Sequence, residues 1–325
     1  MKAIICEKYG SPDVLRLEEV EKPTPRDGEV LVKIHAASLN AYDWHMLTAD
    51  IFLVRLMGGG LRKPKNRIPG ADLAGTVEAV GSGVTQFKPG DAVYGDIAGH
   101  TGGSFAEYVA VPERALAPKP TNLSFEEAAA VPMAAVTALQ GLRDVGQIQP
   151  GKKVLINGAS GGVGTFAVQI AKSFGAEVTA VCSTRNVEQA RSLGADHVID
   201  YTAEDFTQSG RQYDLIFAAN GYHPLGAYKR ALSPKGIYVM AGGSMAQIFQ
   251  AMLLGPWMSR DGEKKLGNVS AKMNRTDLDT VTELLENGKV VPVIDKRYTL
   301  SETPEALRYL GQGHARGKVI ITMNH

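Results

Sequence analysis

Residues 154–164 read VLINGASGGVG, and this stretch is the main evidence for the predicted fold. It begins with an apolar run that predicts a strand, contains four glycines, and leads into Phe166–Lys172, a run that predicts a helix ended by Gly175. A glycine-rich turn between a strand and a helix is what a dinucleotide-binding fingerprint requires. The start of such a helix offers N–H groups and a partial positive charge to phosphate groups.

The glycine-rich turn is expected to hold the phosphates of a dinucleotide. We expect the tight turn near Ala159, where glycine is usual, the close backbone approach at Gly161, and the close helix packing at Gly164. The alternative is an ordinary strand-to-helix turn that needs small residues, and the alternating elements downstream count against it. The predicted phosphate-binding residues are Ala159, Ser160, Gly161, Gly162, Val163 and Gly164.

From Lys152 onward the chain alternates between strand-like and helix-like segments. Apolar strands without alternating polarity are buried on both faces, which predicts an α/β domain with a doubly wound parallel sheet and helices on each side. In open sheets of this kind cofactors bind at the carboxyl ends of the strands. The predicted strands are Val154–Ile156, Glu177–Val181, His197–Ile199, Asp214–Phe217 and Gly236–Met240. The predicted cofactor contacts at later strand ends are Tyr201, Asn220, Gly242, Gly243 and Ser244.

The sections before and after the alternating region are richer in short strands. Runs such as Glu29–Ile34 are punctuated by Gly, Pro and Asp, which predicts a β-rich fold. Ser124 has capping-box spacing to Glu127 and marks the start of a helix. We predict a β-rich domain over 1–123, a dinucleotide-binding domain over 124–267, and a return to the first domain over 268–325.

The composition excludes several classes of protein. The 325 residues include 35 Lys and Arg against 34 Asp and Glu, a net charge of +1, so no global field would attract nucleic acid or an anionic membrane. Hydrophobic residues at 44% and charged residues at 21% are typical of a globular chain rather than a disordered one. Two cysteines exclude a disulfide scaffold and a thiolate-rich zinc lobe.

Neither a targeting segment nor a membrane span is expected. Met1–Cys6 is followed at once by Glu7 and Lys8, which leaves too short an apolar run for a signal peptide, so a cytoplasmic location is expected. Gly236–Ser259 contains no charged residue, but its glycines and amides favour strand, turn and buried helix over a membrane span.

The end of the second strand of the alternating region predicts which dinucleotide binds. An NAD site places an acidic residue there, about 20 residues beyond the glycines, whereas this chain has Ser183, Thr184 and Arg185. The hydroxyls can donate to a 2′-phosphate, and the guanidinium adds charge and further donors. We therefore expect NADPH rather than NADH, the alternative being an ordinary exposed loop arginine.

A hydrolase is a remote alternative for the same residues. Gly158–Gly162 also satisfies the G-x-S-x-G pattern of a nucleophile elbow, with Ser160 as the nucleophile. His100–Gly103 mimics an oxyanion-hole loop, and Asp295 and His314 could complete a triad. Against this, a hydrolase does not need the last glycine of the fingerprint, and His314 falls outside the alternating region.

Motifs spread over nearly the whole chain resemble the medium-chain dehydrogenase/reductase superfamily, and most closely its zinc-free quinone oxidoreductase branch. Each motif is weak alone, but the set is highly specific. The resemblance implies a GroES-like, partly barrelled catalytic domain, a Rossmann domain, a cofactor in the cleft between them, and a homodimer. The motifs are Val32–Asn40 with Asp43, Pro69–Gly75, Lys88–Val93, Ala130–Ala138, the glycine-rich turn, Gly194–Tyr201 and Gly317–Val319.

The chain differs from the zinc alcohol dehydrogenases of that superfamily at the positions of their zinc ligands, and this difference changes the reaction that we expect. The resemblance places the positions of their catalytic zinc ligands at Asn40, Ala71 and Asp72, which offer neither thiolate nor imidazole, so no metal is expected. Alcohol oxidation benefits from zinc because the metal stabilises the alkoxide. A quinone or an α,β-unsaturated carbonyl accepts hydride through its own conjugation, so we expect an NADPH-dependent, zinc-independent reductase for such small molecules.

The resemblance also suggests individual site residues. Asn40 would hold the nicotinamide or the substrate carbonyl, or else cap a turn. Tyr42, in the same loop, would donate a proton or a hydrogen bond, or else pack on that loop, and Asp43 would orient the loop rather than perform acid–base work. Thr137 is expected beside the nicotinamide. Because no proton donor is assured, a non-catalytic NADPH-binding sensor or scaffold protein stays an alternative.

Overall fold

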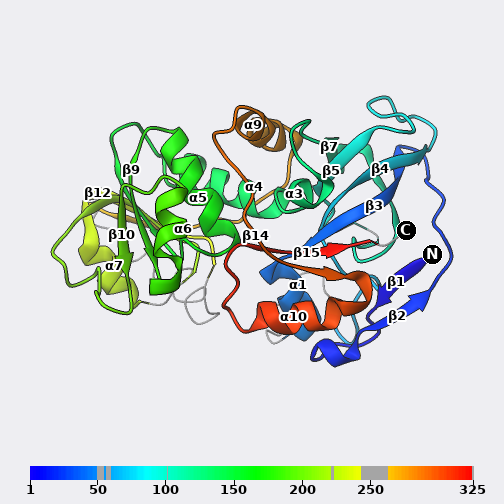
Figure 1. Ribbon diagram of the computed structural model, residues 1–325, viewed down its shortest axis with the longest axis horizontal. Coiled ribbons are helices and arrows are strands. Elements are labelled where there is room, and N and C mark those ends of the chain that lie inside the picture. Colours follow the sequence, from blue (N-terminus) through cyan, green and yellow to red (C-terminus); the bar gives the residue numbers. More distant parts are fainter. Residues whose placement is uncertain (50–54, 56–59, 101, 221–222, 243–262, 324–325) are drawn as a thin grey trace. The chain divides into compact units, whose positions relative to one another are not determined.

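The computed structural model of the protein describes residues 1–49, 55, 60–100, 102–220, 223–242 and 263–323. The chain forms two compact units (Figure 1). Unit 1 consists of Met1–Met133, Met273–Glu286 and Pro292–His325, and unit 2 consists of Ala134–Lys272 and Asn287–Val291.

The two units follow the predicted order of a β-rich section, an alternating section and a return to the β-rich part. Helix α3 (Phe125–Ala129) belongs to unit 1, although the predicted range 124–267 includes it. Compactness alone does not define a domain that folds independently. The predicted boundaries after residues 123 and 267 therefore stay predictions.

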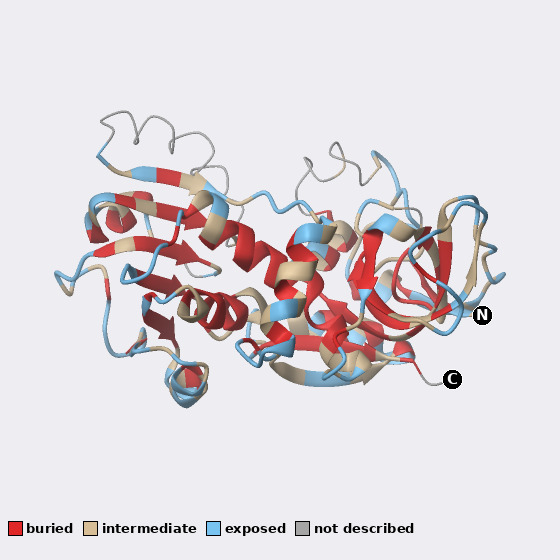
Figure 2. Cartoon of the chain, turned by 90° about the horizontal axis from the view of Figure 1, so that it is seen from above, coloured by how far each residue is buried: buried red, intermediate tan, exposed pale blue. Residues whose placement is uncertain are grey.

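Unit 2 is built on a six-stranded parallel sheet. Its strand order is β10-β9-β8-β11-β12-β13, which corresponds to 3-2-1-4-5-6 in order of appearance, the order of a Rossmann fold. The four inner strands of this sheet are largely buried (Figure 2), and the parallel order confirms the predicted α/β architecture. The strands are β8 (Lys153–Asn157), β9 (Glu177–Cys182), β10 (His197–Asp200), β11 (Tyr213–Ala218), β12 (Leu232–Met240) and β13 (Lys265–Asn268).

The core of unit 2 lies against this sheet. Leu155, Val181, Ile216 and Tyr238, each from a different strand, belong to one buried apolar cluster. The apolar side chains that predicted buried strands therefore pack together. The helices of this part are α4 (Pro132–Gln140), α5 (Gly162–Ser173), α6 (Val187–Ser192) and α7 (Leu225–Ala231).

Unit 1, where the resemblance implies a GroES-like domain, is built on a seven-stranded, mainly antiparallel sheet. The order is β14-β15-β3-β4-β5-β7, and β6 also pairs with β3. Pairing of β15 with β3 brings the end of the chain beside its beginning, red beside blue in Figure 1. The strands are β3 (Glu29–Leu39), β4 (Asp72–Val80), β5 (Ala92–Asp96), β6 (Tyr108–Pro112), β7 (Leu116–Pro118), β14 (Ile294–Thr299) and β15 (Lys318–Thr322); β1 (Lys2–Ile5) and β2 (Arg16–Glu19) form a separate pair.

The helices of unit 1 include one that the sequence does not predict. The segment after Leu39 is predicted as a loop, but Ala41–Thr48 form helix α1, so that prediction is wrong. Its first turn is stabilised because Oδ2 of Asp43 accepts the N–H of Asn40 at 2.8 Å. The capping box predicted at Ser124 is confirmed, since Ser124 and Glu127 exchange both bonds at the start of α3. The other helices are α9 (Arg275–Glu286) and α10 (Thr303–Gly311).

None of the helices within the described residues is long and apolar enough to cross a membrane. Much of Gly236–Ser259, the segment without charges, lies outside those residues.

Candidate functional site

Two glycines of the glycine-rich turn are required by close backbone contacts. Gly158 has φ of +83°, and a Cβ placed there would lie 2.8 Å from the backbone nitrogen of Asn220. A Cβ at Gly164 would lie 2.0 Å from the carbonyl oxygen of Gly158. The left-handed residue of the turn is thus Gly158, one position before Ala159, and no larger residue fits at either glycine.

Gly161 lies where the backbone is open to a ligand. It is the N-cap residue of α5, and the atom nearest to a Cβ placed there is 3.7 Å away. No side chain in the described part of the chain caps this helix start. The first N–H groups of α5, beside the partly exposed Ser160, Gly162 and Val163, are thus placed to meet an anion, and the helix dipole favours negative charge. These residues fit the pyrophosphate of a dinucleotide.

Asn186 ties the glycine-rich turn to the end of β9, and the sequence does not single it out. Its Nδ2 donates to the hydroxyl of Ser160 at 3.0 Å and to the hydroxyl of Ser183 at 3.1 Å. Its place just before α6 signals only a helix cap. Because the Ser160 hydroxyl accepts from an amide rather than pairing with a histidine, this geometry gives no support to Ser160 as a nucleophile.

Charges of both signs lie near the residues predicted to bind a 2′-phosphate. Thr184 and Arg185, after β9, are exposed. The hydroxyls of Thr184 and Thr202 are 3.0 Å apart, and hydrogen bonds from these two side chains lower the pKa of Asp200. The ionised carboxylate of Asp200 therefore opposes a phosphate at this edge, while the guanidinium of Arg185 favours one.

Other predicted cofactor contacts lie at the carboxyl ends of strands of the same sheet. Tyr201, Asn220 and Gly242 follow β10, β11 and β12, and Tyr201 is 59% exposed. Thr137 is a buried residue of α4. The remaining two predicted contacts, Gly243 and Ser244, lie outside the described residues.

A buried polar cluster lies within unit 1, and we name it the Asp72 cluster. Its members come from the end of β3, the start of α1, the start of β4, the end of β5 and the start of β15. All are at most 8% exposed, which is rare for charged side chains. The members are Ser38, Asn40, Asp43, Asp72, Asp96 and Lys318.

Asp72 is the centre of the hydrogen bonds in this cluster. Its Oδ2 accepts from the hydroxyl of Ser38 and from Nδ2 of Asn40, each at 2.9 Å, and from the ammonium of Lys318 at 3.3 Å. Its Oδ1 accepts the backbone N–H of Met133 at 3.0 Å. The carboxylate thus has partners at both oxygens, as a buried charge requires.

Asn40 is held at both ends of its carboxamide. Its Nδ2 donates to Asp72, and its Oδ1 accepts from the ammonium of Lys318. The predicted site residue therefore has a single, defined amide orientation in this structure.

Two further carboxyls of the cluster hold protons near neutral pH. Burial, reinforced by the charge of Asp72, raises the pKa of Asp43 to about 8 and that of Asp96 to about 7. Oδ1 of Asp43 has no hydrogen-bond partner among the described residues, which suits a protonated carboxyl. The carboxylate of Asp72 forms a buried ion pair with the ammonium of Lys318, so these two opposite charges compensate each other.

Tyr42 lies next to Asp43 in the first turn of α1 and is 37% exposed. Burial raises the pKa of its hydroxyl, and the charges of Asp43 and Asp96 act in the same direction. The hydroxyl therefore keeps its proton at physiological pH and can donate it in a hydrogen bond.

Four members of the Asp72 cluster are missing from the predicted site residues. Ser38 is noticed only as part of the motif Val32–Asn40. Asp72 is noticed only as a counterpart of a zinc ligand and Lys318 only as part of a terminal motif, whereas Asp96 carries no signal. Lys318 and Asn40 are 278 positions apart. Only the pairing of β15 with β3 brings them together.

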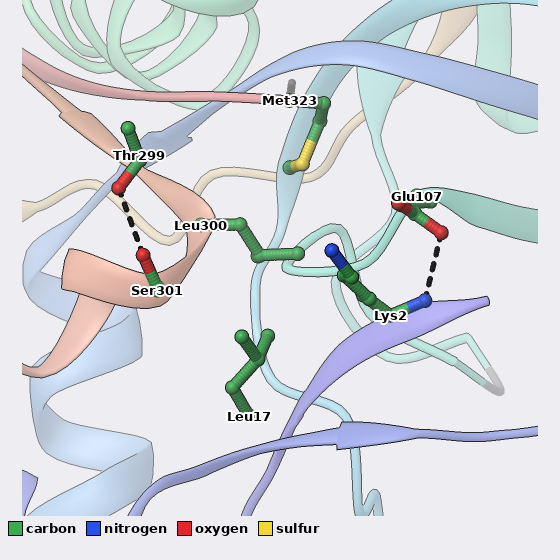
Figure 3. Close-up of a pocket in the computed structure, with 7 residues that line it drawn as sticks. All are labelled: Lys2, Leu17, Glu107, Thr299, Leu300, Ser301 and Met323. Carbon is green, nitrogen blue, oxygen red and sulfur yellow. Dashed lines mark hydrogen bonds between the residues drawn. The ribbon is translucent and has the colours of Figure 1, made fainter. Parts of the chain in front are cut away.

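A hollow of about 100 Å³ lies elsewhere in unit 1 (Figure 3). Bonds between Lys2 and Glu107 and between Thr299 and Ser301 lie along it. Small-molecule sites usually enclose about 300–1,000 Å³. This hollow is too small to be the candidate site, and it shares no residue with the Asp72 cluster; its lining is Lys2, Leu17, Glu107, Thr299, Leu300, Ser301 and Met323.

Comparison with known proteins relates the whole chain to oxidoreductases. The family profile of an alcohol dehydrogenase GroES-like domain matches residues 26–121, and that of a zinc-binding dehydrogenase matches residues 193–321. The 2-methylene-furan-3-one reductase of Solanum lycopersicum is 39% identical, covering 99% of this chain and 79% of that protein. The chloroplastic quinone-oxidoreductase QR1 of Triphysaria versicolor is 34% identical, covering 99% and 98%.

Solved structures agree over the same length. The quinone oxidoreductase from Coxiella burnetii superposes with a TM-score of 0.87 at 29% identity, covering 100% of this chain and 99% of that one. The GroES-like sheet, the Rossmann strand order and the glycine-rich turn are the structural counterparts of these matches. The chain therefore belongs to the medium-chain dehydrogenase/reductase superfamily, in its quinone oxidoreductase-like branch.

Proposed function

We propose that the protein is an NADPH-dependent reductase that transfers hydride to a quinone or an α,β-unsaturated carbonyl compound without zinc. The observation that carries the proposal is the Asp72 cluster: the ammonium of Lys318 contacts Asn40 and Asp72, two of the three positions that match zinc ligands. The third, Ala71, is fully buried, and its methyl side chain has no atom that could coordinate a metal. A cationic group thus already lies against the side chains that a divalent metal would need.

The names of relatives support the same class of acceptor. They include a quinone oxidoreductase, a 2-methylene-furan-3-one reductase and, in Arabidopsis thaliana, an NADPH-dependent alkenal/one oxidoreductase that is 35% identical. A conjugated acceptor needs no metal-stabilised alkoxide, so a site without zinc suits it. Neither the sensor alternative nor the hydrolase alternative is supported by these relatives.

The glycine-rich turn and the strand ends of unit 2 would hold the cofactor. The pyrophosphate would meet the N–H groups at Gly161–Val163, and Ser183, Thr184 and Arg185 would meet a 2′-phosphate. Thr137, Tyr201, Asn220, Gly242, Gly243 and Ser244 stay proposed contacts for the rest of the molecule. Bound NADPH would supply the hydride.

The residues of unit 1 would prepare the acceptor for that hydride. Charge develops on the acceptor oxygen as hydride arrives, and hydrogen-bond donors placed at that oxygen lower the barrier. Tyr42 can donate from its protonated hydroxyl, and Asn40 can donate from the Nδ2 hydrogen that is not given to Asp72. Asp43 would orient Asn40 through the bond to its N–H.

Steady-state kinetics test the proposal. We expect NADPH oxidation with a panel of quinones and enones, unchanged after treatment with a zinc chelator, and no oxidation of simple alcohols. A purified protein that binds NADPH but reduces none of these acceptors would contradict it.

Three finer properties belong to the same proposal. A homodimer is expected from the resemblance, and light scattering should give twice the mass of the chain. A cytoplasmic location is supported by Cys6 and Cys182, which are free, buried thiols suited to a reducing compartment. The substrate is a small molecule, and no nucleic acid partner is proposed because the net charge is +1.

A further inference from the structure

Lys318 is a buried cation with a small and specific set of contacts. Its side chain is 3% exposed, and its ammonium meets Oδ1 of Asn40 and Oδ2 of Asp72. Its backbone is fixed on both sides, because Lys318 pairs with Ile294 of β14 and the next residue pairs with Leu39 of β3. The ammonium therefore reaches the cluster from a rigid sheet rather than from a loop.

The chemistry of the two neighbours selects one orientation of the Asn40 carboxamide. A lysine ammonium only donates and a carboxylate only accepts. Oδ1 of Asn40 must therefore face Lys318, and Nδ2 must face Asp72, as the structure has them. A 180° flip would place the NH₂ group against the ammonium and the carbonyl against the carboxylate, so that both contacts would be repulsive.

This orientation decides what Asn40 can offer to a ligand. With Oδ1 turned toward Lys318 and one Nδ2 hydrogen given to Asp72, the remaining Nδ2 hydrogen is the group that can meet a further partner. A donor of this kind recognises a carbonyl oxygen and discriminates against groups that themselves only donate.

We propose that Lys318 is a positioning residue that locks the Asn40 carboxamide as a hydrogen-bond donor, and so makes the site specific for a ligand carbonyl. The proposal rests on the proposed function, since the carbonyl is that of the quinone or enone acceptor or of the nicotinamide carboxamide. Lys318 does not itself touch substrate or cofactor; it acts through Asn40.

The variants that test this remove charge while keeping size. Lys318→Met keeps the length of the side chain and removes its donors, while Lys318→Met combined with Asp72→Asn also removes the carboxylate that would otherwise be left buried without a counter-charge. Lys88→Met is the matched control, because Lys88 forms an exposed ion pair with Asp91. Asn40→Ala and the double variant Asn40→Ala/Lys318→Met complete a double-mutant cycle.

We expect kcat for a quinone to fall about 100-fold to 1,000-fold in Lys318→Met and in Asn40→Ala, the usual effect of losing a donor at a developing oxyanion. The double variant should lose no more than Asn40→Ala alone, because Lys318 acts through Asn40. The paired Lys318→Met/Asp72→Asn variant should show the same loss with a folded protein, and Lys88→Met should match the wild type. Unchanged kcat in a folded Lys318 variant, or losses that multiply in the double variant, would overturn the proposal.

A second readout needs no turnover. The side-chain NH₂ resonances of Asn40, assigned by their absence in Asn40→Ala, should shift or broaden in the Lys318 variants and stay in place in Lys88→Met. If the wild type reduces no acceptor, the proposed function fails, and this spectrum still decides the role of Lys318. Unmoved resonances would show that Lys318 does not hold the carboxamide.

Discussion

At the scale of single residues, the most unusual feature is a pair of buried carboxyls that hold protons near neutral pH. Asp43 and Asp96 have pKa values of about 8 and about 7 because they are buried beside Asp72. An aspartate in the unfolded chain has a pKa of about 3.9. The folded state therefore binds protons that the unfolded state has already lost.

This difference predicts how stability depends on pH. Because the folded pKa values are raised, the contribution is fully present below pH ~4 and is lost as pH rises through about 7 and 8, by at most about 1.4 kcal/mol per pH unit for each group. Urea unfolding from pH 5 to 8 should show the free energy of unfolding decreasing, and Asp43→Asn should weaken that decrease. The exposed Asp27→Asn serves as the control. Identical pH dependence in Asp43→Asn and the wild type would refute the raised pKa of Asp43.

Two charged residues near the predicted 2′-phosphate site, Arg185 and Asp200, are expected to have opposite effects on NADPH binding. Arg185→Ala should weaken NADPH binding about 10-fold to 100-fold and leave NADH binding nearly unchanged, since a hydrogen bond to a charged group contributes about 1.5–3 kcal/mol. Asp200→Asn should strengthen NADPH binding, because it removes the carboxylate beside Thr184. Fluorescence titration with both dinucleotides measures this, with Arg191→Ala, an exposed arginine paired with Glu188, as the control. Equal effects of Arg185→Ala on the two dinucleotides would contradict NADPH preference.

At the scale of elements, the turn between β8 and α5 separates two uses of glycine. Gly158 and Gly164 are required by the packing of the backbone itself, whereas a Cβ at Gly161 would make only an ordinary contact, at 3.7 Å from the carbonyl oxygen of Gly158. Glycine is therefore required for backbone packing at Gly158 and Gly164, and we propose that at Gly161 it allows a ligand to approach the backbone.

Alanine substitutions distinguish these uses. Gly164→Ala should destabilise the protein by about 1–3 kcal/mol, because its Cβ would overlap the carbonyl oxygen of Gly158. Gly161→Ala should leave the melting temperature nearly unchanged and weaken NADPH binding. Gly226→Ala, at a helical glycine whose Cβ would have no neighbour nearer than 3.8 Å, is the control. Normal NADPH affinity in Gly161→Ala would argue against a pyrophosphate at this turn.

At the scale of the whole molecule, the return of the chain to unit 1 completes that unit. Helix α9 contacts Tyr94, a fully buried residue of β5. The hydroxyl of Tyr94 lies 2.7 Å from Oγ1 of Thr282 and 3.3 Å from the carbonyl oxygen of Leu278, both of which belong to α9. Strand β15 then pairs with β3. The last part of the chain is therefore structural for unit 1 and also supplies Lys318 to the Asp72 cluster.

Removal of one hydroxyl tests how firmly this late helix is bound. Tyr94→Phe should destabilise the protein by about 1 kcal/mol, since it leaves the ring in place and removes the hydrogen bond to Thr282. Thr282→Val should cost a similar amount, and the double variant should cost less than the sum, as for any pair in contact. Thermal unfolding measures all three. Strict additivity would show that the two hydroxyls do not interact.

Whether a structural feature could be predicted from the sequence depends on how far apart its interacting residues lie in the chain. The strand and helix around residues 154–164 and the capping box at Ser124 are predictable, because each depends on neighbours within a few positions. Helix α1 is missed, since its cap is an Asn–Asp pair and the helix is only eight residues long, too short for a clear apolar period. Asn186 is missed because its bonds to Ser160 and Ser183 depend on how the turn and β9 lie together.

The class of fold, the position of the glycine-rich turn and the family resemblance follow from the sequence alone, because helix and strand propensity and motif spacing depend on residues close together in the chain. Three other properties appear only in the folded molecule. Lys318 contacts Asn40 and Asp72, the pKa values of two carboxyls are raised, and the Asn40 carboxamide has one orientation. Those properties arise from burial and from sheet pairing between the two ends of the chain. Neither is visible in the sequence, because Asn40 and Lys318 lie 278 positions apart and meet only when β15 pairs with β3.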